Sequence, residues 1–281
     1  MTEAATTLSY AYAVLRPPPD GQPLGPLHGV DDAPVHLVAT DRLAAAVSAV
    51  PAAEYDEPAL RARLGDLDRL AAMARAHHAV VGALAARGPV LPLRLATVYR
   101  GDERVRAVLR EAGDAFDAAL RRVTGRVEIG LKVYTRPAPP RPRVAAPAPT
   151  ADAETADAAD ALRSGRGGSG RDYLNRRRRE HRAREQTWER AARLAGRLDG
   201  ELAGLAEDSR RLRPQSPELA EAPGENVLNA AYLVPAERAA EFVRTARESA
   251  AGVEDARVEV TGPWAPYSFA EAPDLAGQAP A

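Results

Sequence analysis

Three glycines, Gly165, Gly167 and Gly170, have the spacing G-x-G-x-x-G that can bring a backbone close to a pyrophosphate. In a dinucleotide site this motif follows a β-strand and opens a helix within a βαβ unit. Here the preceding residues are mainly Ala and Asp and carry no strand pattern. The spacing therefore indicates a flexible linker, and we expect no nucleotide cofactor.

The histidines and serines also lack the spacing that metal binding or catalysis requires. No two histidines stand four residues apart with a carboxylate placed as zinc ligands need. Ser169 lies between glycines rather than in a G-x-S-x-G elbow, and cysteine is absent, which excludes disulfides and thiolate sites. We expect no catalytic residue, no metal and no cofactor, and hence a protein that is not an enzyme. The five histidines are His28, His36, His77, His78 and His181.

A run of arginines is the strongest charge feature of the chain. Arg176, Arg177, Arg178 and Arg179 follow one another, and Arg182 and Arg184 extend the run along the same predicted helix. Clustered guanidinium groups suit phosphates, but glutamates interleave with them and the whole chain carries a net charge of −1. The run predicts a solvated helix or one that faces an acidic protein surface. A nucleic-acid-binding regulator is the alternative.

The segment from Val90 to Tyr134 has the pattern strand, helix, strand. Apolar residues alternate with others over 91–96 and over 127–134, as in strands that are buried on one face. Between these segments, apolar residues recur every three or four positions from Asp102 to Val123, which predicts a helix. Such a segment predicts a scaffold rather than an active site.

The preceding residues supply more strands and one long helix. Strands are predicted over 10–15, 36–39 and 43–50, and a helix from Pro58 to Leu84. The resulting order suggests a ferredoxin-like layer with both helices on one face, as a first domain over residues 1–136.

The rest of the chain predicts a second, smaller α/β domain. Residues 137–170 are rich in Pro, Ala and Gly and indicate a flexible linker. A helix over about 171–208 and a strand-helix-strand unit then form a domain over 171–262. Pro263 and Pro266 should stop the last strand and leave an irregular tail over 263–281. The fold class is thus α+β with two domains.

Four sequence motifs in order resemble the gas vesicle protein GvpL/GvpF family. They are LPLR from Leu91, GRVEIGLKVY from Gly125, GRDYL from Gly170 and GPWAPYSF from Gly262. The resemblance implies a non-enzymatic accessory or minor structural protein of gas vesicles. Such a protein would bind the hydrophobic major shell protein (GvpA-like) and other gas vesicle proteins, and would assist assembly. Leu95-Ala96-Thr97 departs from the usual Phe-Gly-Thr, which puts the local packing in question.

Candidate partner-binding residues lie in the family-like segments and in the arginine run. Gly130 would permit close approach of a partner between Glu128 and Lys132, and the alternative is a cross-strand pair of Glu128 with Arg94. The candidates are Leu91, Pro92, Arg94, Glu128, Gly130, Lys132, Arg176, Arg177, Arg178 and Arg179.

Three aromatic residues of the tail, Trp264, Tyr267 and Phe269, either lock the tail onto the core or anchor a partner.

Apolar runs are too short for a membrane helix, which requires about 18 residues or more, so we expect no membrane partner. A cytoplasmic protein associated with gas vesicles is the expected location.

Overall fold

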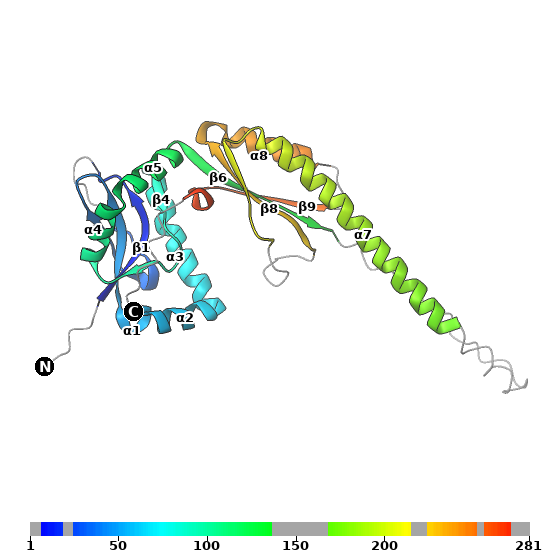
Figure 1. Cartoon of the computed structure of the whole chain (residues 1–281), viewed down its shortest axis with the longest axis horizontal. Helices are drawn as coiled ribbons and strands as arrows, with labels where there is room; N and C mark the ends of the chain where they lie inside the picture. Colours follow the sequence, from blue (N-terminus) through cyan, green and yellow to red (C-terminus); the bar gives the residue numbers. More distant parts are fainter. Residues whose placement is uncertain (1–6, 19–24, 137–167, 215–223, 252–255, 271–281) are drawn as a thin grey trace, which may run out of the picture.

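The computed structural model describes residues 7–18, 25–136, 168–214, 224–251 and 256–270, which form two antiparallel sheets with helices packed on them (Figure 1). The predicted mixture of helices and sheets is confirmed. The predicted linker lies outside the described residues except for 168–170, which already belong to a helix. No helix within the described ranges is long and apolar enough to cross a membrane.

The first sheet has the strand order β2-β3-β1-β4, and the short β5 also pairs with β1. The strands predicted over 36–39 and 43–50 are present as β2 and β3, and they pair as an antiparallel hairpin from Val35 with Ser48 to Ala39 with Ala44. The strands are β1 (Thr7–Leu15), β2 (Val35–Ala39), β3 (Ala44–Pro51), β4 (Val90–Pro92) and β5 (Val98–Tyr99).

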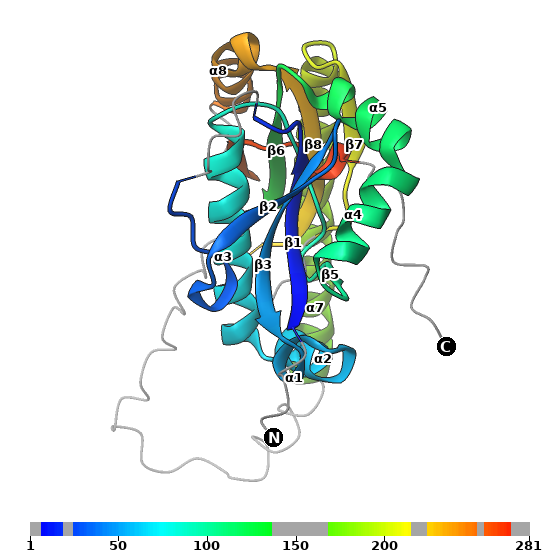
Figure 2. The same cartoon turned by 90° about the vertical axis from the view of Figure 1, so that its left-hand side faces the viewer.

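Helices cover both faces of this sheet (Figure 2). Met73, Val80 and Val81 of α3 pack against Tyr10 and Tyr12 on one face. Helices α4 and α5 pack on the other face, against Ala11 and Val47. The ferredoxin-like prediction of both helices on one face is therefore wrong. The physical reason lies in β1, whose residues Tyr10–Val14 are all buried, so the strand needs cover on both sides.

The helices that accompany the first sheet are shorter than the sequence predicts. The predicted helix from Pro58 to Leu84 is two helices, separated at Asp66, whose carboxylate accepts hydrogen bonds from the backbone N–H groups of Asp68 and Arg69. The helical elements are η1 (Val30–Asp32), α1 (Ala52–Tyr55), α2 (Glu57–Gly65), α3 (Leu67–Ala85), α4 (Asp102–Glu111) and α5 (Gly113–Val123).

The second sheet has the order β7-β8-β6-β9, and α7 and α8 cover one of its faces. Strand β6 is central here, paired with β8 and β9. The prediction that this strand belongs to the first sheet is wrong, and a boundary after residue 136 would divide the second sheet. The elements are β6 (Arg126–Thr135), α7 (Gly168–Ala203), β7 (Asp208–Arg211), β8 (Asn226–Pro235), η3 (Ala236–Arg238), α8 (Ala239–Ala250) and β9 (Ala256–Trp264).

The last strand passes the position where proline was expected to stop it. Strand β9 runs to Trp264, and its register against β6 shifts between the partners of Glu128 and Gly130. Gly262 lies within this irregularity at a φ of +105°. Strand β9 is an edge strand, so no strand pairs with its outer side. Pro263 lacks a backbone N–H, but no hydrogen bond between strands is lost on that side. The short helix η4 (Tyr267–Phe269) then ends the described chain near β6 (Figure 1).

Helix α7 is longer than the sheet it packs on (Figure 1). Its C-terminal half buries Ala191, Leu194, Leu198 and Leu202 against the second sheet. Its N-terminal part extends past the sheet, and the side chains of residues 173–190 are exposed there, apart from the half-buried Thr187; we call this part the projecting half. The sequence pattern predicted that this helix runs to residue 208. It ends at Ala203, and β7 follows.

Candidate functional site

Two of the three candidates in or beside the first sheet are buried. Leu91 is fully buried, and Pro92 beside it is buried too, where β4 pairs with β1. Neither side chain can contact a partner in this fold, so their expected role in docking is corrected. Arg94 is exposed, just after the strand, and it makes an interaction within the chain.

Glu128 lies on β6 in the second sheet and binds Ser268 of the segment that follows β9. The backbone N–H of Ser268 donates to Glu128 Oε2 at 2.6 Å, and the Ser268 hydroxyl donates to Oε1 at 2.7 Å. Burial raises the pKa of the Glu128 carboxyl, although these two hydrogen bonds and the charge of Arg210 oppose the shift. Glu128 and Arg94 do not form the cross-strand pair considered above, because Arg94 follows a strand of the other sheet.

Gly130 was expected to allow the close approach of a partner, but the neighbouring strand β9 lies close to it instead. A Cβ at Gly130 would lie 2.5 Å from Thr261 Oγ1, on the paired strand β9. Lys132 is half-buried opposite Glu259 and also interacts within the chain. The candidates on β6 therefore serve the internal packing of the second sheet.

The aromatic tail joins the two halves of the molecule. We call residues Trp264–Phe269 the C-terminal latch. Tyr267 stacks on His78 of α3, with ring centroids 5.9 Å apart, and Trp264 meets the same imidazole edge-on at 4.9 Å. Phe269 is fully buried against Ala231 and Leu233 of β8.

The C-terminal latch thus contacts both halves of the molecule, the one built on the first sheet and the one built on the second sheet. Tyr267 and Ala265 pack against the core between α3 and the first sheet, whereas Phe269 packs on the second sheet. The Arg210 guanidinium lies 5.3 Å from the centre of the Phe269 ring. Sequence reasoning found these aromatic residues but missed Ser268, since a lone serine in a proline-rich tail carries no signal.

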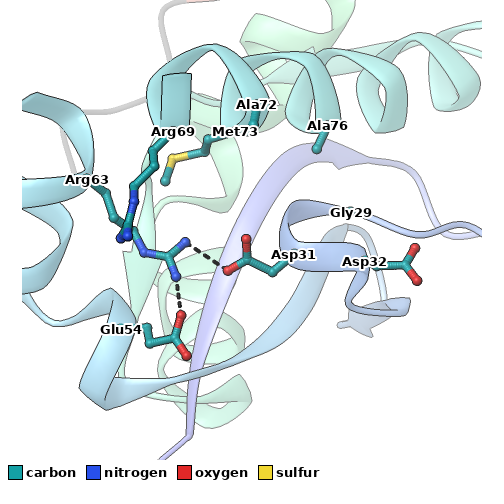
Figure 3. Close-up of a pocket in the computed structure, with 9 residues that line it drawn as sticks. All are labelled: Gly29, Asp31, Asp32, Glu54, Arg63, Arg69, Ala72, Met73 and Ala76. Carbon is teal, nitrogen blue, oxygen red and sulfur yellow. Dashed lines mark hydrogen bonds and ion pairs between the residues drawn. The ribbon is translucent and has the colours of Figure 1, made fainter. Parts of the chain in front are cut away.

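A pocket of about 460 Å³ opens between η1, α1, α2 and α3 (Figure 3). Arg63 bridges two carboxylates there, donating to Asp31 Oδ2 at 2.8 Å and pairing with Glu54. The Tyr55 hydroxyl also donates to Asp31 Oδ2, at 2.7 Å, and burial raises the pKa of Tyr55. Ala72 and Met73 form the apolar side of the pocket.

This pocket was not predicted from the sequence, because its charged residues come from four separate elements, η1, α1, α2 and α3. Asp31 and Asp32 have φ values of 50° and 58°, a left-handed backbone that costs energy for residues other than glycine. The Arg63 network holds Asp31 in place. Its cation and carboxylates satisfy one another, which indicates a structural role in fixing the loop.

The buried side chain of His77 has a role in packing rather than in chemistry. Burial lowers the pKa of His77 to about 4, so the imidazole is neutral near pH 7, and its Nδ1 lies 3.1 Å from the Tyr10 hydroxyl oxygen. Across the described residues, no group of three or more His, Asp or Glu side chains is placed to hold a metal ion.

The four candidate arginines of the run are all exposed. Arg176, Arg177, Arg178 and Arg179 all lie on the projecting half of α7. The geometry therefore separates the candidates into two groups. Those on the sheets are engaged within the chain, and those on α7 face outward.

One prediction concerns the carboxylate that holds the latch. Because folded Glu128 keeps its proton to higher pH than the unfolded chain, it lowers the stability of the fold as pH rises from about 4.3 through the folded pKa. We expect Glu128→Gln to flatten this part of the curve of unfolding free energy against pH, measured by urea denaturation. Glu237→Gln, an exposed carboxylate, is the control. An unchanged slope in Glu128→Gln would contradict the assignment.

Comparisons with known proteins cover nearly the whole chain. Residues 8–271 match the family described as Gas vesicle synthesis protein GvpL/GvpF. Gas vesicle protein L of Streptomyces sp. (strain CB03234) is 46% identical over 263 residues, which are 94% of this chain and 92% of that protein.

Two crystal structures share the fold. Gas vesicle protein GvpF from Anabaena sp. PCC7120 matches with a TM-score of 0.62 and 18% identity, over 95% of this chain and 99% of its own. GvpF from Microcystis aeruginosa matches with a TM-score of 0.61 and 21% identity, over 95% of this chain and 100% of its own.

Proposed function

The chain belongs to the GvpL/GvpF family of gas vesicle synthesis proteins and so has a role in gas vesicle formation, and we propose that it is a non-enzymatic assembly protein that binds the major shell subunit. It would act as a chaperone-like component, located at gas vesicles. The family is one of gas vesicle structural and assembly proteins rather than a known enzyme family.

The observation that carries the proposal is the projecting half of α7. This segment places Tyr173, Leu174 and Trp188 in solvent although they are large and apolar, and arginines surround them. A wall that excludes water is built from subunits whose apolar faces are exposed before assembly, so a partner that covers such a face would limit aggregation. Exposed apolar side chains on an extended helix suit that task.

The test is co-expression of the full chain with the major shell subunit, followed by co-purification at low and high salt. We expect the shell subunit to be retained at low salt and partly released at high salt, since exposed charge pairs are screened. The whole chain is needed because a truncation after residue 136 would leave β6 without its partners β8 and β9. Absence of retention with a folded, soluble shell subunit would refute direct shell binding.

A second candidate function rests on the same exposed arginines. A nucleic-acid-binding regulator would show a steep loss of affinity with salt, because each neutralised phosphate releases counterions. Fluorescence anisotropy with duplex and single-stranded DNA measures this slope directly. The three glutamates Glu180, Glu185 and Glu189 on the same half of α7 oppose phosphate binding and favour the protein partner.

A further inference from the structure

The face of α7 that is buried on the second sheet continues beyond the sheet as an exposed row. In the buried half, the row consists of Ala191, Ala195, Leu198 and Leu202, at spacings of four, three and four residues. In the projecting half, the same alternation of three and four gives Leu174, Arg177, His181, Arg184 and Trp188. We call these five residues the α7 row.

The alternating spacing keeps the α7 row on one side of the helix. A repeat of 3.5 residues drifts by about 20° per heptad on a straight helix, so Leu174 and Trp188, two heptads apart, stay on one face. Both are exposed, at 55% and 44% of their surface. One helix face thus carries an apolar residue at each end and basic residues between them.

The charges at the centre of the α7 row are available to a partner. His181 lies 3.6 Å from Glu185 on its own helix. Arg177 and Arg184 have no carboxylate within ion-pair distance in the described part of the chain, and both are exposed. Seams of this kind are filled by a second helix whose side chains complement them in charge and polarity.

We propose that the α7 row is the docking face for an acidic amphipathic helix of a partner protein. The partner helix lies along α7, with apolar side chains against Leu174 and Trp188 and carboxylates against Arg177 and Arg184. This inference rests on the proposed function, because it names the contact through which an assembly protein would hold a partner.

Two other occupants fit the α7 row less well. A second copy of this chain would place Arg177 and Arg184 against the same arginines, and like charges across a helix seam repel. Nucleic acid would gain nothing from Leu174, and its phosphates would meet the interleaved glutamates. Both occupants are separate outcomes of the test below.

The probe is a designed helical peptide of about three heptads with Leu at the outer seam positions and Glu at the inner ones. A matched peptide carries Lys in place of Glu. The chain has two tryptophans, so Trp264→Phe leaves Trp188 as the single tryptophan reporter, within the α7 row. We expect the Glu peptide to bind with a blue shift of the Trp188 emission, and the Lys peptide to bind at least tenfold more weakly.

Two double variants of equal charge test the position of the contact. Arg177→Glu with Arg184→Glu changes the α7 row, whereas Arg179→Glu with Arg182→Glu changes arginines on the other side of the same helix turns. The first pair should weaken binding of the Glu peptide by roughly tenfold or more and the second by less than about threefold. Equal losses in both would overturn the proposal, because they would show only a general charge effect.

Other results would also overturn the proposal. These are equal binding of the two peptides, preference for duplex or single-stranded DNA over the Glu peptide, and a homodimer that blocks the peptide. Circular dichroism of each variant confirms that α7 remains folded. If the peptide fails but the shell subunit is still retained, only the docking face is refuted. If the peptide binds but the shell subunit is not retained, the docking face stands and shell binding is refuted.

Discussion

Phe269→Ala is expected to lower the free energy of unfolding by about 3 to 5 kcal/mol, because a fully buried aromatic ring leaves a cavity when it is truncated. The ring fills the contact between the C-terminal latch and Ala231 and Leu233 of β8. Removing it should also weaken the hold of the latch on His78, since Tyr267 is two residues away on the same short helix. Urea denaturation measures the loss of stability.

Hydrogen–deuterium exchange locates the effect of Phe269→Ala. We expect faster exchange over 256–270, with the core of the first sheet little changed, because the latch spans the two halves of the molecule without forming the centre of either. Leu67→Ala, a truncation of a side chain that is 71% exposed, is the control and should stay within about 0.5 kcal/mol of the original chain. A loss below about 1 kcal/mol for Phe269→Ala would show that the latch contributes little to stability.

Gly130→Ala is the second change with a large expected effect. The added methyl group would lie 2.5 Å from Thr261 Oγ1, closer than nonbonded atoms allow, so β9 or the threonine must move. We expect a loss of about 1 to 3 kcal/mol, as for other overpacked sites. Equilibrium denaturation at neutral pH measures it.

A double-mutant cycle separates this clash from other effects of losing the glycine. Thr261→Ala removes Oγ1, and the threonine Cβ lies 3.9 Å from the position that the added methyl group would occupy, which is an ordinary contact. Gly130→Ala in the Thr261→Ala background should therefore be neutral, or stabilising by about 0.5 to 1 kcal/mol because alanine loses less backbone entropy than glycine. Additive losses would contradict the clash.

The element types along the chain followed from the sequence with few errors. The period-two pattern of β6 and the three-and-four spacing of α4 and α5 depend on neighbouring residues. The strand predicted over 91–96 ends at Pro92, and the helix predicted from Asp102 to Val123 divides into α4 and α5 at Ala112. Strand β7 was missed because Asp208–Arg211 has neither apolar alternation nor β-branched residues. The break at Asp66 was missed because the apolar stripe continues through it.

The sequence predicted the roles of the candidate residues less well than it predicted the types of the elements. Glu128, Gly130 and Lys132 looked like surface residues when β6 was placed in the first sheet. In the structure β6 lies inside the second sheet, between β8 and β9, where Glu128 is buried and Gly130 and Lys132 are partly buried. The arginines of α7 stayed on the surface because a charged helix face needs no long-range partner to be exposed.

Most strands and helices, the arginine run and the motifs of the family resemblance were predictable from the sequence alone, because each depends on residues close together in the chain. Only the tertiary structure decided which sheet β6 joins, that helices cover both faces of the first sheet, and that the latch contacts both halves of the molecule. The reason is that a strand pattern specifies which side chains are buried but not what they are buried against, so pairing partners far apart in sequence are chosen by packing the whole chain.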